Sequence, residues 1–373
     1  MSRGIAAERW LDESCSISPT AQQAATSFAP TVHFLNESLS AMNSRELRLK
    51  NRPTGTPSAA DFELADVTLA KPGQGQLLVQ NLAMSVDPYM RGRMRDVKSY
   101  SAPWQIGEVM QGGAVGRVLE SRHPGFAAGD LVSSNLGWRE AFVSDGAGIS
   151  RIADPVAPPS AYLGVLGMPG MTAYVGLLHI AALKAGETVF VSGAAGAVGS
   201  LVGQIAKIRG CTVVGSVGSA DKIEYCRGIG FDHVFDYHAG DLPGQLRRAA
   251  PEGLDVYFDN VGGDHLQAAL GAMRVNGRLA LCGAIANYNA TAPVPGPNNL
   301  MLAIGQSLTL RGFIVSRHED LRADFMRDMS AWVTSGQVKY RETRYEGLAQ
   351  APQAFIGLFS GANTGKMIVH LAD

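Results

Sequence analysis

The chain has 373 residues, of which 46 % are hydrophobic and 17 % are charged, which is typical of a soluble globular protein with room for two domains. Its formal net charge of −1 argues against binding to nucleic acid or to an anionic membrane, and no apolar run approaches the length that spans a bilayer. The four cysteines, which lack CxxC spacing, are Cys15, Cys211, Cys226 and Cys282. They indicate neither a zinc site nor a disulfide framework, and they fit a reducing cytoplasm.

Residues 1–42 differ from the rest of the chain. They are rich in Ser, Ala, Thr and Gln and show no sustained hydrophobic period, so we expect a disordered N-terminal extension. A transit peptide is disfavoured by the acidic residues Glu8, Asp12 and Glu13. An upstream start codon that adds little is the remaining alternative.

Residues 43–166 carry short β-forming runs separated by Gly and Pro turns. The runs are LRLKNRP, FELADVTLA, GQLLVQNLAMSV, GGAVGRVLESR and DLVSS. They predict a mostly β domain with a barrel-like core.

Residues 167–336 alternate between strand and helix signals. The expected strands are TVFVSG, CTVVGSVG, HVFDY, LDVYFDNVG, RLALCGAI and LTLRGFIV, with helices such as HLQAALGAMR between them. This order predicts a doubly wound parallel sheet. Residues 337–373 return to β signals and end in GKMIVHL, which we expect to add a strand to the first domain.

A glycine turn follows the first strand of the predicted sheet. Gly193, Gly196 and Gly199 recur at three-residue spacing, and apolar residues at helical spacing begin after Ser200. Strand, turn and helix in this order are a dinucleotide-binding fingerprint, in which the helix N-terminus holds the pyrophosphate. The pattern is GxxGxxG rather than GxGxxG, and a purely structural turn is the alternative.

The expected nucleotide is NADP. In NAD-binding sheets the second strand ends in a carboxylate that bonds the ribose hydroxyls, whereas here it ends in VGSVGS, which includes Gly218. Lys222 lies just beyond, and Tyr237 closes the third strand. A cation and a hydroxyl suit the 2′-phosphate of NADP, although a solvated lysine at a helix start is the alternative for Lys222.

No metal is expected at the site. A β domain joined to such a sheet is typical of zinc alcohol dehydrogenases, which need thiolate and imidazole ligands. No cysteine lies between Arg45 and Cys211, and His123 is the only histidine between Met42 and His179. One histidine cannot build a zinc site, which disfavours metal-assisted alcohol oxidation.

Six motifs occur in order along the chain: LAMSVDPYMRGRM, MPGMTAYVGLL, GAAGAVGSLVGQIAK, FDNVGG, LCGAIANYN and NTGK. From about Met42 to Asp373 the chain thereby resembles the zinc-free branch of the medium-chain dehydrogenase/reductase superfamily, and most closely its prostaglandin reductase, or leukotriene hydroxydehydrogenase, group. The resemblance implies an α/β fold in which a GroES-like β-barrel domain is split in sequence around a Rossmann domain. It also implies a homodimer that reduces the carbon–carbon double bond of α,β-unsaturated aldehydes and ketones with NADPH.

The resemblance also assigns site residues by motif. The pyrophosphate would lie on Gly196, Ala197, Val198 and Gly199, and the 2′-phosphate and ribose on Gly218, Lys222 and Tyr237. The rest of the cofactor would be lined by Asn260, Cys282, Gly283, Ala284, Tyr288, Phe313, Ile314, Val315 and Asn363. Tyr288 is the candidate catalytic residue, as a donor to the substrate carbonyl, and a plain pocket-wall tyrosine is the alternative.

Three further segments could contribute to the pocket. Asp87, Pro88 and Tyr89 follow a strand and could line it, whereas Arg91 is expected to be structural. Thr172 is expected to cap a helix, with contact to the nicotinamide as the alternative. The proline-rich residues 293–301 are expected to gate the pocket or to carry a dimer contact.

Two other functions share most of these features. A quinone reductase would use the same scaffold with a flatter, wider pocket, and a binding protein could keep the nucleotide fold without turnover. The intact GAAGAVG, Lys222, Tyr288 and NTGK disfavour the binding protein. The chain departs from the family at IANYN and at AIGQSLTLRGFIVSRHED, which flank the pocket, so the physiological substrate is not defined by the sequence.

Deleting residues 1–41 should leave folding and turnover intact, because this segment offers little apolar area to offset its ordering entropy. The test compares thermal unfolding and NADPH oxidation of the truncated and full-length chains. A clearly lower melting temperature of the truncated protein would contradict the expected disorder.

Overall fold

A computed structural model describes residues 41–373 of the chain. Of the extension expected over residues 1–42, only residues 41 and 42 lie within this range. There the expectation is wrong, because Met42 already pairs with Leu69 in an antiparallel ladder. Backbone pairing across the hairpin therefore orders the chain slightly earlier than its composition indicates.

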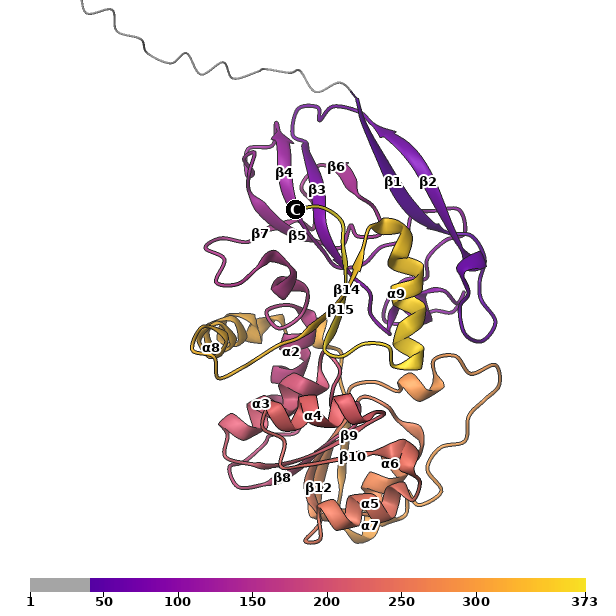
Figure 1. Cartoon of the computed structure of the whole chain (residues 1–373), viewed down its shortest axis with the longest axis vertical. Coiled ribbons are helices and arrows are strands. Elements are labelled where there is room, and N and C mark those ends of the chain that lie inside the picture. The colour runs from indigo at the N-terminus through magenta and orange to yellow at the C-terminus, as the bar shows by residue number, and fades with distance from the viewer. Residues whose placement is uncertain (1–40) are drawn as a thin grey trace, which may run out of the picture. The chain divides into compact units, whose positions relative to one another are not determined.

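The first domain consists of β strands in two sheets (Figure 1). A hairpin joins β1 (Met42–Leu49) to β2 (Phe62–Leu69). The larger sheet contains β3 (Leu77–Ser85), β4 (Ala114–Ser121), β5 (Leu131–Ser134), β6 (Ala141–Ser144), β7 (Ser150–Arg151), β14 (Glu342–Glu346) and β15 (Lys366–His370). Its strand order is β14-β15-β3-β4-β5-β7, with β6 also paired to β3. The GKMIVHL segment does join this domain, because β15 runs antiparallel to β3.

Aromatic rings form the core between the hairpin and the larger sheet. The ring of Trp138 lies 5.9 Å from that of Trp104 and 6.0 Å from those of Phe62 and Phe355. Trp104 and Phe355 meet Trp138 edge to face, whereas Phe62 is stacked on it, and both arrangements add attraction to the burial of large apolar surfaces. Phe355 belongs to α9 (Ala351–Gly357), so the C-terminal segment completes a core that begins at residue 47.

The second domain contains a six-stranded, all-parallel sheet. Its strands are β8 (Thr188–Val191), β9 (Thr212–Val217), β10 (His233–Asp236), β11 (Leu254–Asp259), β12 (Met273–Leu281) and β13 (Thr309–Gly312). They follow the order β10-β9-β8-β11-β12-β13. This is the Rossmann order, in which the winding direction reverses between the first and fourth strands and leaves a crevice at their carboxyl ends.

Helices cover both faces of this sheet or connect it to the first domain (Figure 1). They are α2 (Met168–Val175), α3 (Gly199–Ile208), α4 (Ala220–Gly228), α5 (Leu242–Ala249), α6 (Gly263–Leu270), α7 (Leu302–Gly305) and α8 (Arg322–Thr334); α1 (Met90–Arg93) follows β3 in the first domain. Within the range that the structure describes, none of the helices is long and apolar enough to cross a membrane.

Two elements differ from their predicted extents. The helix predicted over HLQAALGAMR ends at Leu270, and β12 already begins at Met273, which pairs with Leu254 of β11. The strand predicted over LTLRGFIV ends at Gly312, and residues 313–315 leave the sheet to line a cleft. At Met273 strand pairing overrides the local helix pattern, whereas pairing of β13 with β12 stops at Gly312.

Candidate active site

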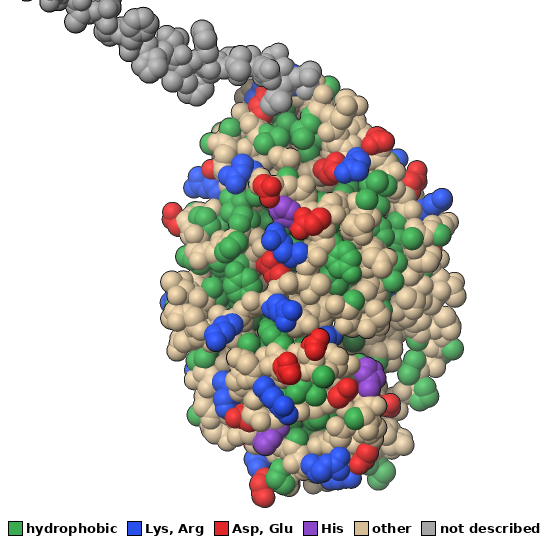
Figure 2. Space-filling view, viewed as in Figure 1, with side chains coloured by type: hydrophobic (Ala, Val, Ile, Leu, Met, Phe, Trp, Pro, Cys, Tyr) green, Lys and Arg blue, Asp and Glu red, His purple; other side chains and the backbone are tan. Residues whose placement is uncertain are grey.

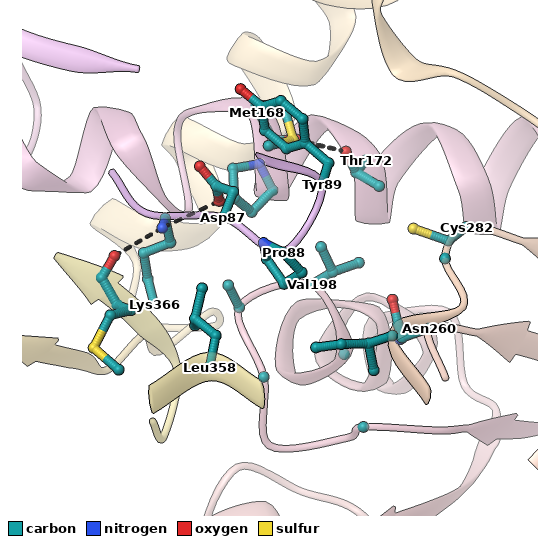
Figure 3. A pocket seen from close by; sticks show the side chains of 18 of the residues that line it. Asp87, Pro88, Tyr89, Met168, Thr172, Val198, Asn260, Cys282, Leu358 and Lys366 are labelled. Carbon is teal, nitrogen blue, oxygen red and sulfur yellow. Dashed lines mark hydrogen bonds and ion pairs between the residues drawn. The ribbon is translucent and has the colours of Figure 1, made fainter. Parts of the chain in front are cut away.

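A cleft of about 2030 Å³ is lined by both domains. On the Rossmann side it follows the carboxyl ends of β8, β9, β11, β12 and β13. On the other side it is lined by residues 85–89 after β3 and by the C-terminal segment, and Figure 3 shows part of this arrangement. The cleft therefore occupies the switch point at which doubly wound sheets bind their ligands.

The glycine turn after β8 forms the floor of this cleft. Gly193 has a φ of 61°, and a Cβ on Gly199 would lie 2.4 Å from the Gly193 carbonyl oxygen, so the turn needs glycine at both positions. No side chain caps the N-terminus of α3. Within the described chain, the N–H groups of Ala197, Val198 and Gly199 donate no backbone hydrogen bond, so they are available to an anion. This cradle fits a pyrophosphate.

The C-terminal segment borders the glycine turn. The N–H of Gly365 donates to the Ala195 carbonyl at 2.7 Å, and Gly365 forms an isolated bridge with Gly196. Asn363 donates from Nδ2 to the Gly365 carbonyl at 2.8 Å. The NTGK motif, residues 363–366, thus packs against the glycine turn, which explains its place beside the cofactor residues.

Lys222 lies in the first turn of α4, just beyond β9, and Tyr237 directly follows β10. Lys222 donates from Nζ to the Gly361 carbonyl at 2.7 Å, and burial lowers its pKa. A Cβ on Gly218 would lie 3.0 Å from the Tyr237 hydroxyl, which places the phenol beside the strand tip. Lys222 is therefore a partly buried, hydrogen-bonded cation rather than a freely solvated one.

Two histidines that the sequence analysis missed surround Tyr237. The His238 ring lies 4.2 Å from the Tyr237 ring, and its Nδ1 lies 3.2 Å from the Gly218 carbonyl oxygen. His265 is buried, its ring lies 5.1 Å from that of Tyr237, and burial lowers its pKa to about 4. Single histidines in polar turns and helices carry no sequence signal that separates them from ordinary structural residues.

Asp259 organises the loop after β11. Its Oδ1 accepts hydrogen bonds from the Tyr257 hydroxyl at 2.7 Å, from the Gly262 N–H at 2.8 Å and from the Val261 N–H at 3.0 Å. The adjacent Asn260 donates from Nδ2 to the Ser192 carbonyl at 2.8 Å. Burial raises the pKa of Asp259. The carboxylate thereby fixes the backbone that presents Asn260 to the cleft.

Thr172 of α2 and Cys282, which follows β12, both line the cleft and are labelled in Figure 3. Thr172 donates to the Met168 carbonyl at 2.7 Å, while Gly167 occupies the N-cap of α2. The expectation that Thr172 caps the helix is therefore wrong, because it lies a full turn inside and bonds back along it. Burial raises the pKa of Cys282 to about 12, so this thiol is un-ionised at neutral pH.

Tyr288 lies on the loop after β12 and lines the cleft. Its hydroxyl oxygen accepts the Ala284 N–H at 3.3 Å, which leaves the O–H free to donate. Burial raises the pKa of Tyr288, so the phenol stays protonated at neutral pH. A second buried phenol, Tyr89, lines the same cleft, and burial raises its pKa as well.

A buried ion pair fixes the wall opposite the glycine turn. Lys366 Nζ lies 3.2 Å from Asp87 Oδ1 and donates to the carbonyls of Val86 and Met367 at 2.9 and 2.8 Å (Figure 3). Asp87 also accepts from the Ser85 hydroxyl. This network joins the segment after β3 to β15.

The predicted cofactor residues meet at one cleft. All of them line it except Ala284, whose N–H instead supports Tyr288. Asp87, Pro88 and Tyr89 line it too, whereas Arg91 is structural, as expected. Lining a cleft assigns no contact by itself, and the individual roles stay predictions.

The donor set of the cleft does not fit a catalytic zinc ion. Across residues 41–373, no three or more His, Cys, Asp or Glu side chains gather where they could hold a metal. Catalytic zinc needs three such protein ligands, so we derive no step through a metal.

Comparison with known families gives two matches. Residues 45–152 match the N-terminal domain of oxidoreductase, and residues 197–331 match a domain described as zinc-binding dehydrogenase. These matches fall in the first domain and in the Rossmann domain, respectively.

Curated relatives align along nearly their whole length. NADPH-dependent curcumin reductase of Escherichia coli (strain K12) is 44 % identical, with 87 % of this chain and 96 % of that protein covered. Prostaglandin reductase 1 of Sus scrofa is 43 % identical, with 86 % and 97 % covered. The NADP-dependent 2-alkenal reductase of Nicotiana tabacum is 42 % identical, with 88 % and 97 % covered.

A solved structure of similar fold contains the cofactor. CurA from Vibrio vulnificus in complex with NADPH is 40 % identical, with a TM-score of 0.84 and with 88 % of this chain and 99 % of that chain covered. The predicted α/β architecture of a Rossmann domain with a GroES-like domain is confirmed. The chain belongs to the medium-chain dehydrogenase/reductase superfamily, in the group of NADP-dependent reductases that contains curcumin reductase, prostaglandin reductase 1 and 2-alkenal reductase.

Proposed function

We propose that the protein reduces the carbon–carbon double bond of α,β-unsaturated aldehydes and ketones with NADPH. The observation that carries this proposal is the protonated phenol of Tyr288 in a cleft that also contains the glycine cradle and Lys222. Relatives above 40 % identity are named as reductases of curcumin, of prostaglandins and of 2-alkenals, which supports the same class of reaction.

Some residues of the cleft would bind the cofactor, and Tyr288 would stabilise negative charge on the substrate. When bound, NADPH supplies the hydride. The turn from Gly193 to Gly199 would hold its pyrophosphate, and Lys222 with Tyr237 would hold its 2′-phosphate. As negative charge gathers on the substrate carbonyl oxygen, Tyr288 donates a hydrogen bond to it, which stabilises the transition state more than the ground state.

A substrate panel tests the reaction class. Enals, enones and quinones are compared with NADPH by the loss of its absorbance, and we expect enals or enones to react fastest. Faster turnover of quinones would favour the quinone reductase alternative. Cofactor binding without turnover of any compound would favour the binding protein.

Lys222→Ala should raise the KM for NADPH and leave the KM for NADH nearly unchanged. A lost charge-assisted bond is worth on the order of 1.5–3 kcal/mol, or roughly ten- to a hundred-fold in affinity. Steady-state kinetics with both cofactors provide the measurement. Lys207→Ala is the matched control, because Lys207 pairs with Asp232 and lies outside the cleft. Equal losses for both cofactors would show that Lys222 does not contact the phosphate.

Tyr288→Phe should lower kcat for enones by roughly ten- to a thousand-fold, as the loss of a donor to a developing oxyanion does. The ring remains, so NADPH binding should hardly change. Single-turnover rates and cofactor titrations separate the two effects. A Phe variant with the parental rate would make Tyr288 a pocket wall and leave the donor to another group.

We further propose that the protein acts as a homodimer in the cytoplasm. β13 is the edge strand of the Rossmann sheet, and exposed edges invite pairing with a second chain. The neighbouring side chains of Leu300, Met301 and Ile304 are 53 %, 81 % and 81 % exposed. Figure 2 shows hydrophobic side chains gathered at the lower right of the molecule, where Figure 1 places the segment before α7. The free thiols of Cys211, Cys226 and Cys282 fit a reducing compartment.

Met301→Glu combined with Ile304→Glu should convert the dimer to a monomer. Burying such side chains contributes about 1.5–3 kcal/mol each, and a charge in their place opposes association. Sedimentation velocity gives the mass, and Leu64→Glu, on the exposed face of the β1–β2 hairpin, is the matched control. A parent protein that sediments as a monomer would contradict the proposed dimer.

A further inference from the structure

The loop that carries Tyr288 has few attachments of its own. Its first part is held to the Rossmann domain, because the Ile285 and Ala286 N–H groups donate to the carbonyls of Asn260 and Val261 at 3.4 and 3.1 Å. From Tyr288 to residue 290 the backbone N–H groups make only local turn bonds. Another support is therefore needed where the phenol leaves the backbone.

The first domain supplies this support through Arg95. Its Nη2 donates to the Tyr288 carbonyl at 2.8 Å and to the Ala290 carbonyl at 3.0 Å. One planar guanidinium thus bridges two carbonyls on either side of residue 289. Such a bridge fixes the direction of the turn as well as its position.

Arg91, four residues before Arg95, also donates a hydrogen bond to the loop that carries Tyr288. Its Nε donates to Asn289 Oδ1 at 3.0 Å, and its Nη2 donates to the Gly55 and Pro53 carbonyls at 2.8 and 3.1 Å. Its side chain is 1 % exposed. Within the described chain, the bonds from Arg91 and Arg95 are the only long-range hydrogen bonds made to residues 288–297.

We propose that Arg95, supported by Arg91, is a positioning residue that sets the place of the Tyr288 phenol in the cleft. It does not line the cleft, although it borders a smaller pocket beside Tyr288, and its bonds to the loop are to main-chain carbonyls, including that of Tyr288. The inference rests on the proposed role of Tyr288 as the donor to the substrate carbonyl. A residue of the first domain would thereby set the distance between the Tyr288 hydroxyl and the substrate carbonyl, although Tyr288 belongs to the Rossmann domain.

Arg95 is the better of the two arginines to change. Arg91 is buried, and its loss would leave several carbonyls without donors, so its variants could fail to fold. Arg95 is only partly buried, and water can reach the carbonyls that it leaves. Arg95→Met keeps the apolar stem and removes the donors, whereas Arg95→Lys restores a single donor group.

The test is a double-mutant cycle on the full-length chain, with parent, Arg95→Met, Tyr288→Phe and the double variant. Arg95→Met should lower kcat for an enone about ten-fold, since misplacing a reacting group by about 1 Å can cost on the order of a hundred-fold. The KM for NADPH should stay at the parental value, and Arg95→Lys should recover part of the rate. In the Tyr288→Phe background, Arg95→Met should cost nothing further, because no donor is left to misplace.

Arg93→Met is the matched control. Arg93 is the last residue of α1, two positions before Arg95, and donates to the Ala102 carbonyl at 2.8 Å and to Gln111 Oε1 at 2.9 Å. It makes no hydrogen bond to the loop that carries Tyr288, so kcat should stay parental. Parental kcat for Arg95→Met, beside a slowed Tyr288→Phe, would overturn the proposal. Equal losses from Arg95→Met in both backgrounds would overturn it too.

Hydrogen exchange separates this inference from the role of Tyr288. Arg95→Met should speed exchange at the amides of Tyr288 and Ala290 and leave those of β11 unchanged. If Tyr288→Phe keeps the parental rate, the donor role fails, and this readout alone decides whether Arg95 positions the loop. Parental exchange at both amides would then overturn the positioning role.

Discussion

The buried ion pair between Lys366 and Asp87 is the contact on which the architecture depends. The two residues lie 279 positions apart in the sequence, yet they meet with almost no exposure, and Lys366 also donates to two carbonyls. Removing one partner of such a pair costs about 3–5 kcal/mol, because the other charge is left buried. The pair closes a domain whose chain is interrupted by the whole Rossmann domain, and it does so beside the cleft. Gly365, the residue before Lys366, bonds to the glycine turn.

The two domains are joined around the cleft largely by donors that meet main-chain carbonyls. Lys222 of the Rossmann domain donates to Gly361, Gly365 donates to Ala195, and Arg95 donates to Tyr288. A carbonyl acceptor is present whatever its side chain is, so the acceptor residues are free to vary, whereas the side-chain donors Lys222 and Arg95 are not. The geometry of the cleft therefore depends on a few donor residues contributed by each side.

This chemistry also explains what the sequence could and could not predict. The glycine turn was predictable because strand, turn and helix are local signals. The missing carboxylate at the end of the second strand pointed to Lys222 and Tyr237, and the NTGK motif pointed to Asn363; all three line one cleft. The donor Arg95 was not predictable, since its acceptors are carbonyls that leave no trace in the sequence. Thr172 was placed wrongly because a hydroxyl that bonds back along a helix looks like a cap in the sequence. Individual cofactor contacts depend on distances to a ligand, which no local pattern contains.

The electrostatics of the cleft favour the gain of negative charge by a substrate. Asp87 is neutralised by Lys366, and Asp259 is surrounded by the donors that shape its loop. Burial keeps Tyr288 protonated and raises the pKa of Cys282 to about 12. A developing enolate beside Tyr288 would therefore meet a phenol donor, and Asp87, which also lines the cleft, is already paired. For the same reason the thiol is a weak nucleophile toward an electrophilic double bond, because the thiolate is the reactive form. Burial thus keeps the Cys282 thiol un-ionised at neutral pH, which slows its alkylation by an electrophilic substrate.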